Sequence, residues 1–225
     1  MGNGLSIRAV LLDMDGLMLD SEPVYRRAWQ SAAAGLGYDL SDEFYLALIG
    51  RNNRDSEAEL VRVFGRDFPL DRFRDDWPLR WQAEVETAGM PVKPGLFGLL
   101  ELVERHRLPL AVATSSDAEQ TVLSLRAAGI DGRFACIVTG DQVSRGKPAP
   151  DIFLEAARRL NVAPAGCLVL EDSDAGVIAA ATAGMPVLMI PDLKRPSAQA
   201  AASAIQVCEN LDDASAFLDT YLHPL

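Results

Sequence analysis

Two aspartates one residue apart, Asp13 and Asp15, come after an apolar run and precede a glycine in the sequence LLDMDG. Side chains at positions i and i+2 of a strand point the same way, so both carboxylates can meet at the strand's C-terminal end. That edge is where open α/β sheets bind ligands. Burying charge at the end of such a strand is energetically costly, so we interpret the two aspartates as reactants. The alternative is that they are a polar strand end that caps the next element.

A second acidic group comes after another apolar run in the sequence VLEDSDAG. Asp174 is a candidate N-cap for the next helix. Glu171 and Asp172 would repel the first pair strongly at the same sheet edge unless a hard cation lay between them. Carboxylate oxygens and backbone carbonyls are the ligands that magnesium prefers. The two groups together therefore predict an Mg²⁺ site.

Hydroxyls and a lysine occupy two further strand ends. Thr114 lies at the tip of its strand with Ser115 and Ser116 behind it, and Lys147, one of three lysines in the chain, lies in a loop before a helix. Helix capping by one of the hydroxyls is the alternative. With the acids, these groups suit phosphoryl transfer to an aspartate. One carboxylate attacks phosphorus, another handles protons, and the metal, the lysine and a hydroxyl hold the transferring oxygens.

The elements that must position these residues alternate from residue 93 onward. Apolar runs separated by single helical segments predict an α/β fold, a doubly wound parallel (Rossmann-like) sheet with helices on both sides. Strands are expected at 7–12, 108–114, 134–138, 167–171 and 186–190, and helices at 96–105, 117–128, 150–160, 174–183 and 213–222.

Between the first strand and residue 93 the pattern is helical throughout, with helices expected at 22–35, 41–49, 53–63 and 71–87. Turn and breaker residues at 16–23 and 89–95 bracket this block. We therefore predict a core domain of residues 1–16 and 93–225 and a helical cap insert of residues 17–92, which can act as a lid.

Composition limits the function classes. The chain has 225 residues, 49% of them hydrophobic, and a net charge of −11. This acidity argues against nucleic acid or an anionic membrane surface as a partner, because both need basic patches. The apolar runs are too short to span a bilayer, and three scattered cysteines predict no disulfide framework. We expect a cytoplasmic protein that binds a small ligand, monomeric or alternatively dimeric.

Four motifs, in order, resemble those of the haloacid dehalogenase superfamily of phosphotransferases. They are the DMDG of Asp13 to Gly16, the Thr114 of ATSS, the Lys147 of GKPAPD and the LEDSDAG of Leu170 to Gly176. The helical insert after the first motif is similar to the cap of the subgroup that includes phosphoglycolate phosphatases and β-phosphoglucomutase. The resemblance implies the fold, the cap and magnesium dependence.

The same resemblance implies roles for the core residues. Asp13 would be the nucleophile that forms an aspartyl phosphate. Asp15 would protonate the leaving oxygen and then deprotonate the attacking water. Thr114 and Lys147 would hold the phosphoryl group.

For the metal, the resemblance implies that Mg²⁺ would bind Asp13, the backbone carbonyl of Asp15, and Asp172. Glu171 would either ligate the ion or orient its waters.

Further substrate contacts are expected from the turns. Gly16, Ser115 and Ser116 are candidates for phosphate binding in the core. Arg51 and Asn52, in the polar stretch LIGRNNRDS, are candidates in the cap, where arginine can bind phosphate or carboxylate by paired hydrogen bonds. A solvated turn is the alternative for Arg51 and Asn52.

The predicted function is a magnesium-dependent phosphatase acting on a small phosphorylated metabolite, such as a sugar phosphate, phosphoglycolate or a nucleoside monophosphate. Asp15 argues against a dehalogenase, since dehalogenating members lack that aspartate. A hexose-phosphate mutase is the enzymatic alternative, disfavoured because Tyr25 falls where the mutase has a histidine and the cap has no lysine. A phosphoacceptor signalling module is the non-enzymatic alternative, disfavoured because Met14 separates the paired acids.

Overall fold

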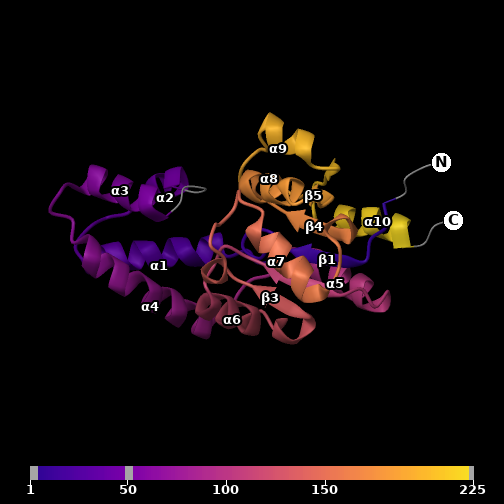
Figure 1. Cartoon of the computed structure of the whole chain (residues 1–225). Coiled ribbons are helices and arrows are strands. Elements are labelled where there is room, and N and C mark those ends of the chain that lie inside the picture. Colours follow the sequence, from indigo (N-terminus) through magenta and orange to yellow (C-terminus); the bar gives the residue numbers. More distant parts are fainter. Residues whose placement is uncertain (1–4, 49–52, 223–225) are drawn as a thin grey trace. The chain divides into compact units, whose positions relative to one another are not determined.

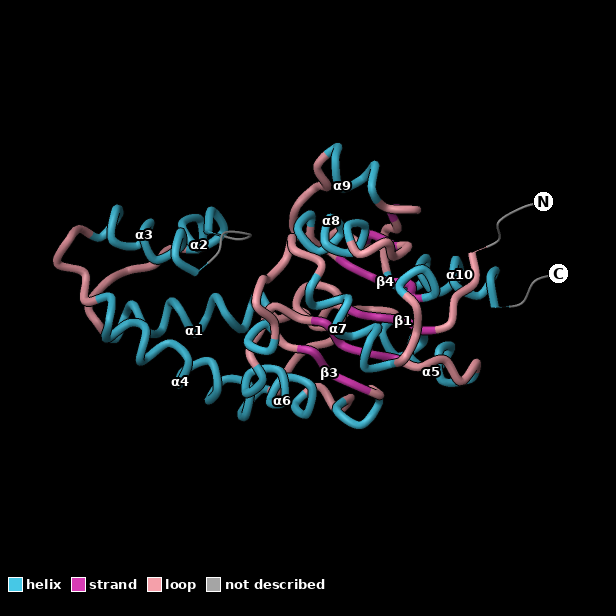
Figure 2. The backbone as a smooth tube through the Cα atoms, viewed as in Figure 1, coloured by secondary structure: helices cyan, strands magenta, loops and turns pink. Residues whose placement is uncertain are grey.

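Six short segments form one parallel sheet in the computed structural model, which describes residues 5–48 and 53–222 (Figure 2). The strand order is β3-β2-β1-β4-β5-β6. Strands β1, β2, β4 and β5 are buried along their whole length, as expected for a sheet covered on both faces. The predicted doubly wound parallel sheet is thus confirmed. The strands are β1 (Ala9–Leu12), β2 (Leu110–Ala113), β3 (Cys136–Val138), β4 (Cys167–Glu171), β5 (Val187–Met189) and β6 (Gln206–Val207).

Strand order reverses at β1, which lies between β2 and β4. Leu12 pairs with Val112 on one side and with Leu170 on the other. The residues that come after these three strands therefore arrive at the same edge of the sheet, and the Asp13 amide still donates to the Leu170 carbonyl at 3.1 Å. Such a reversal point is where open α/β sheets bind ligands.

Helices cover both faces because crossovers between parallel strands are right-handed. Helices α5 and α6 lead from β1 towards β3, whereas α7 and α8 lead back towards β5, so the two pairs lie on opposite faces (Figure 1). Helix α9 packs on α8, and α10 packs on α5. The bounds are α5 (Leu96–Arg105), α6 (Ala118–Ala127), α7 (Asp151–Leu160), α8 (Asp174–Thr182), α9 (Ala198–Ser203) and α10 (Leu211–Leu222), with 3₁₀ turns at Asp131–Arg133, Gly140–Gln142 and Pro164–Gly166.

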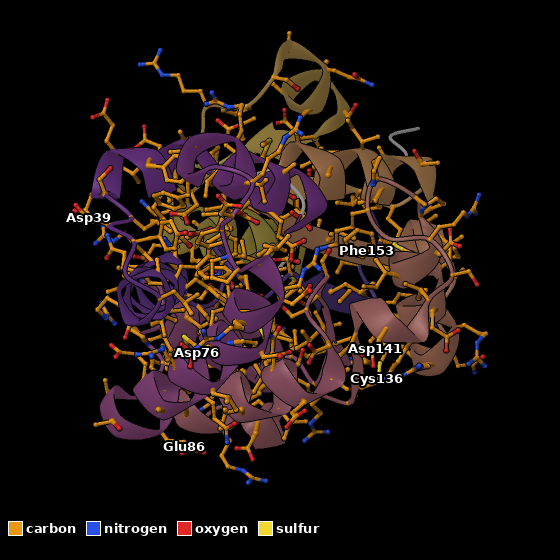
Figure 3. All side chains as sticks on the ribbon, turned by 90° about the vertical axis from the view of Figure 1, so that its left-hand side faces the viewer. Asp39, Asp76, Glu86, Cys136, Asp141 and Phe153 are labelled. Carbon is orange, nitrogen blue, oxygen red and sulfur yellow. The ribbon has the colours of Figure 1, made fainter. Side chains whose placement is uncertain are left out.

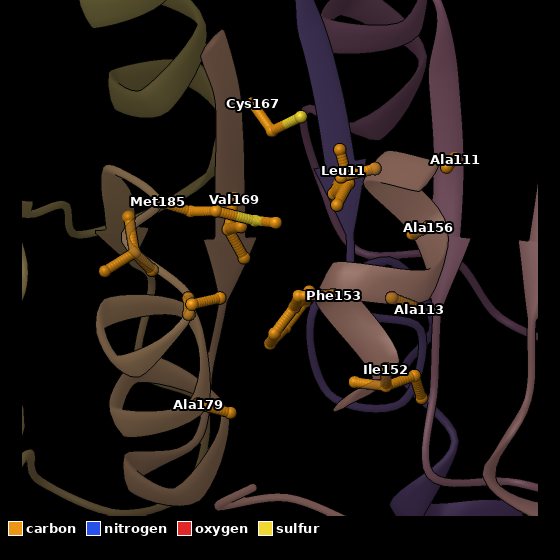
Figure 4. Close-up of a cluster of buried hydrophobic side chains, with 14 of the residues drawn as sticks. Leu11, Ala111, Ala113, Ile152, Phe153, Ala156, Cys167, Val169, Ala179 and Met185 are labelled. Carbon is orange, nitrogen blue, oxygen red and sulfur yellow. The ribbon is translucent and has the colours of Figure 1, made fainter. Parts of the chain in front are cut away.

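A fully buried apolar cluster joins the sheet to α7 and α8. Figure 4 shows Phe153 of α7 in this cluster, together with Leu11 of β1 and Val169 of β4. Burying a side chain of this size stabilises the fold by about 2–3 kcal/mol. The cluster fixes α7, and with it the loop that precedes the helix and carries Lys147.

Two elements and two caps differ from the sequence-based expectation. The exposed two-residue strand β6 and the alanine-rich α9 have no apolar run or period to reveal them. Ser173, not Asp174, is the N-cap of α8, because its hydroxyl accepts from the Gly176 amide. Asp117, not a hydroxyl of residues 114–116, caps α6.

The chain divides into two compact units, a core unit of residues 1–20 and 91–225 and a helical unit of residues 21–90. The helical unit consists of α1 (Glu22–Gly35), α2 (Asp42–Leu48), α3 (Asn53–Phe64) and α4 (Leu70–Ala88). Its acidic residues Asp39 and Glu86 are exposed on its surface (Figure 3). Assignment of the insert as a cap stays a prediction.

Aromatic side chains form the interior of the helical unit. Trp29 meets Phe73 edge-on, with ring centroids 5.2 Å apart, and Tyr25 stacks on Trp81 at 5.6 Å. Such pairs add about 0.5–1.5 kcal/mol to the gain from burial. The tryptophans are therefore packing residues of this unit.

Along the described ranges, no helix is both long and apolar enough to cross a membrane. Cys136, Cys167 and Cys208 are all free thiols, as the sequence predicts.

Candidate active site

Lys147 lies at the centre of the sheet edge. Its ammonium donates to Asp13 Oδ1, to Glu171 Oε1 and, at 3.1 Å, to the Ala113 carbonyl. Only 5% of its side chain is exposed. Lys147 therefore joins the ends of β1, β2 and β4, three strands that are distant in sequence.

The electrostatics of Lys147 favour its charged form. Burial alone disfavours an ammonium, but the carboxylates of Asp13 and Glu171 outweigh this effect and raise the pKa of Lys147. The ammonium also lies 5.1 Å from the ring centroid of Phe153, a cation–π distance. The lysine is thus a permanent positive charge next to Asp13.

Glu171 has partners at both carboxylate oxygens. Oε1 accepts from Lys147, while Oε2 accepts from the amide and the hydroxyl of Ser173, each at 2.9 Å. The side chain is fully buried. This geometry lets Glu171 orient Lys147, and its predicted role as a metal ligand or as a group that orients the metal's waters stays a prediction.

Gly176 makes room for the Glu171 carboxylate. A Cβ atom at this position would lie 1.8 Å from Glu171 Oε1. The first turn of α8 can therefore approach the site this closely only with glycine.

We expect Gly176→Ala to destabilise the protein by about 1–3 kcal/mol, because the clash displaces a buried carboxylate or the helix. The matched control is Gly98→Ala in α5, where a Cβ would meet nothing within 4 Å. That control should be neutral or stabilising by up to about 1 kcal/mol. Urea unfolding of both variants measures the difference, and equal stability of the two would contradict the packing argument.

The carboxylates of Asp13 and Asp172 repel each other in their ionised forms. Burial raises the pKa of Asp13 to about 7; Lys147 opposes this rise and Glu171 adds to it. Burial also raises the pKa of Asp172 to about 9, and the charges of Asp13 and Glu171 add to that shift. A cation between Asp13 and Asp172 would relieve this repulsion.

Gly16 turns the chain after the acidic pair. Its φ of +86° lies in the left-handed region that favours glycine, and a Cβ there would lie 2.5 Å from Asp172 Oδ2. The Asp172 carboxylate thus lies against the backbone next to Asp15. The predicted phosphate-binding role of Gly16 stays a prediction, since the observed contact is with Asp172.

The donor set fits Mg²⁺. Carboxylates of Asp13 and Asp172 and the carbonyl of Asp15 are hard oxygen donors, and burial and mutual repulsion raise the pKa values of both carboxyls even though Lys147 lies beside them. In the described part of the chain no three His, Cys, Asp or Glu side chains form a ready cage. The fit therefore rests on two carboxylates and a carbonyl.

The hydroxyl residues after β2 have distinct positions. Thr114 is buried, and its Oγ1 accepts from the Ser116 amide at 3.1 Å. Ser115 is exposed. Ser116 donates its hydroxyl to Asp15 Oδ2 at 2.6 Å, so the structure brings Ser116 to the Asp13–Asp15 edge.

Arg51 and Asn52 lie outside the described residues, so their predicted substrate contacts stay predictions. Sequence reasoning missed three supports of the site: Ser173, Gly176, and Gly140, whose amide donates to the Ser116 carbonyl at 2.9 Å. Ser173 and Gly176 lie within the motif of residues 170–176 that also contains Glu171. Their closeness to Glu171 in the sequence was the available signal of a role at the site.

Buried carboxylates and a buried lysine lie together where the strand order of the parallel sheet reverses, and such a site suits phosphoryl transfer. The family model for haloacid dehalogenase-like hydrolases matches residues 7–184. The chain belongs to this family, as the four motifs predict, and it is an enzyme of the phosphoric monoester hydrolase class.

Individual relatives agree with this placement. A phosphorylated carbohydrates phosphatase of Thermotoga maritima is 33% identical over 179 residues, which cover 80% of this chain and 82% of the relative. The fructose-1-phosphate phosphatase YqaB of Escherichia coli is 32% identical over 181 residues, covering 78% and 92%. The crystal structure of a CbbY mutant from Rhodobacter sphaeroides in complex with xylulose-(1,5)bisphosphate has a TM-score of 0.78 at 28% identity, covering 91% and 95%.

Proposed function

We propose that the protein is a magnesium-dependent phosphatase of small sugar phosphates that works through an aspartyl phosphate on Asp13. The observation that carries the proposal is the position of Asp13, at the tip of the central strand and ion-paired with the buried Lys147. Similarity to two named carbohydrate phosphatases supports sugar phosphates as the substrate class.

In the first step the Asp13 carboxylate attacks phosphorus, and the bond between phosphorus and the sugar oxygen breaks. The electron pair stays on the sugar oxygen, which takes a proton from Asp15. Lys147 and the hydroxyl of Thr114 stabilise the charge on the phosphoryl oxygens. Because Thr114 Oγ1 accepts from the Ser116 amide, its own proton is available to a phosphoryl oxygen.

In the second step water attacks the aspartyl phosphate and gives its proton to the Asp15 carboxylate. The bond between phosphorus and Asp13 breaks, which releases phosphate and restores both side chains. Mg²⁺, held by Asp13, Asp172 and the carbonyl of Asp15, would supply charge neutralisation at the transferring group. Glu171 acts through Lys147, which it holds against Asp13.

The testing experiment is phosphate release from a panel of sugar phosphates, phosphoglycolate and nucleoside monophosphates, with Mg²⁺ or with chelator. We expect metal-dependent release that is greatest for sugar phosphates. A sugar 1-phosphate that isomerises to its 6-phosphate without release would instead identify a mutase. The stacking of the half-buried Tyr25 ring on Trp81 disfavours that outcome, because the ring packs against the aromatic cluster of the helical unit.

The raised carboxyl pKa values predict how stability depends on pH. A group whose folded pKa exceeds its unfolded value adds stability at low pH, and this stability is lost as the pH rises through the folded value. Asp13 and Asp172 have ordinary values of 3.8 and folded values of about 7 and 9. We therefore expect the metal-free protein to lose stability as the pH rises from about 4 to about 9.

Mg²⁺ should reverse this trend, because a cation favours the ionised carboxylates and binds the folded state. Thermal unfolding with chelator or with excess Mg²⁺ at pH 6 and pH 9 measures the effect. The Mg²⁺-induced rise in Tm should be larger at pH 9 and should shrink in Asp172→Asn. A rise that is larger at pH 6 would contradict the assigned metal ligands.

We also propose a cytoplasmic location and a monomeric state, with a dimer as the alternative.

A further inference from the structure

We propose that Ser116 is a positioning residue for Asp15, which it holds in the orientation needed to protonate the leaving oxygen. The inference rests on the proposed function, since it assumes that Asp15 is the general acid. It also changes the predicted role of Ser116 from phosphate ligand to support for a catalytic carboxyl.

The hydrogen bond between the two residues carries the inference. Ser116 Oγ donates to Asp15 Oδ2 at 2.6 Å, across 101 residues of sequence. A serine hydroxyl has one proton to donate. Because that proton is committed to Asp15, Ser116 cannot at the same time donate to a phosphoryl oxygen.

The two oxygens of Asp15 therefore have different surroundings. Oδ2 accepts from Ser116, whereas Oδ1 is buried and has no hydrogen-bond partner among the described residues. A buried carboxyl oxygen without a partner is costly in the resting protein. Oδ1 is therefore the atom that carries the transferred proton, because it has no hydrogen-bond partner among the described residues and can bind the leaving oxygen of the substrate.

The loop that carries Ser116 is itself held in place. The Ser116 amide donates to Thr114 Oγ1, and the Ser116 carbonyl accepts from the Gly140 amide at 2.9 Å. A Cβ at Gly140 would lie 2.3 Å from the Ser115 carbonyl oxygen, so only glycine allows this approach. The position of the Ser116 hydroxyl is thus determined by packing between the loops after β2 and β3.

General acid catalysis matters most when the leaving group is a poor one. An alkyl phosphate such as glycerol 2-phosphate expels an alkoxide that must be protonated, whereas p-nitrophenyl phosphate expels a stable phenolate. A residue that orients the acid should therefore matter for the alkyl ester and not for the aryl ester. A phosphate ligand should matter equally for both.

The experiment compares kcat/KM for glycerol 2-phosphate and p-nitrophenyl phosphate in the wild type, Ser116→Ala, Ser116→Thr and Asp15→Asn, all with saturating Mg²⁺. In Ser116→Ala we expect kcat/KM to fall roughly 10- to 100-fold for the alkyl ester and less than about 3-fold for the aryl ester, part of the effect of general acid–base catalysis. Asp15→Asn should show the same selectivity more strongly. Ser116→Thr, which keeps the hydroxyl, should restore the alkyl activity.

Thr182→Ala is the matched control, because it removes an exposed hydroxyl that only bonds the Ile178 carbonyl within α8. If Ser116→Ala lowers kcat/KM equally for both esters and raises KM, Ser116 binds phosphate and does not position Asp15. If the kinetics of Ser116→Ala are unchanged, Ser116 has neither role. If Asp15→Asn leaves alkyl hydrolysis intact, the role of Asp15 as general acid in the proposed mechanism fails. If Asp15→Asn lowers it and Ser116→Ala does not, only the positioning role is wrong.

Discussion

Asp13→Asn should abolish phosphate release, lowering kcat by at least about 10⁴-fold, because an amide cannot act as the nucleophile in place of a carboxylate. The substitution keeps the size of the side chain. It removes one of the charges that raise the pKa of Asp172, so the metal-free variant should fold at least as stably as the wild type at neutral pH. Steady-state phosphate release and thermal unfolding measure the two effects.

The matched control for this variant is Asp131→Asn, which makes the same chemical change at an exposed position in a 3₁₀ turn of the core unit. Its activity should equal that of the wild type. Phosphate release by Asp13→Asn within about tenfold of the wild-type rate would show that another group attacks phosphorus. An unfolded Asp13→Asn protein would contradict the assignment of Asp13 as a chemical rather than a structural residue.

Lys147→Met should cost both activity and stability. Removal of the ammonium leaves Asp13 and Glu171 buried beside Asp172 without their common cation. Breaking a buried ion pair from one side typically costs about 3–5 kcal/mol, because the remaining charge is uncompensated. Urea unfolding at neutral pH in the presence of chelator should show a loss of this size, and phosphate release should fall by about 10²-fold or more.

The double variant Lys147→Met with Glu171→Gln separates the two effects. The Glu171→Gln change removes one of the buried charges that lost its partner, so part of the lost stability should return. Activity should stay low, because the lysine that would bind the phosphoryl group is still absent. Lys147→Arg should not rescue activity, since a planar guanidinium does not fit a buried site built around a single point charge. Full stability in Lys147→Met alone would contradict the ion pairs of Lys147 with Asp13 and Glu171 as a source of stability.

Local patterns were sufficient to predict the sheet and the identity of the central site residues. Buried parallel strands are apolar on both faces, so β1, β2, β4 and β5 stand out as continuous apolar runs. Polar residues that interrupt such runs must lie at their ends. Asp13, Thr114 and Glu171 were therefore recognisable as neighbours at one sheet edge before any contact was known.

The partners of those residues depend on tertiary structure. Lys147 reaches Asp13 across 134 residues and Ser116 reaches Asp15 across 101, and no local period encodes such contacts. Glu171 was predicted either to ligate the metal or to orient its waters, and only the folded chain shows that its two oxygens accept hydrogen bonds from Lys147 and Ser173. Side-chain direction and burial decide between these roles, and both result from packing.

The amino-acid sequence alone was thus enough to identify the buried strands, the acidic edge, the lysine and the family, because these depend on apolar runs and on residue types at strand ends. The folded chain was needed to learn which carboxylate orients Lys147, which oxygen of Asp15 is free of partners among the described residues, and why Gly140 and Gly176 are glycines. The physical reason is that a hydrogen bond or a clash of a few ångströms is a property of two segments brought together by folding, and neither segment specifies it alone.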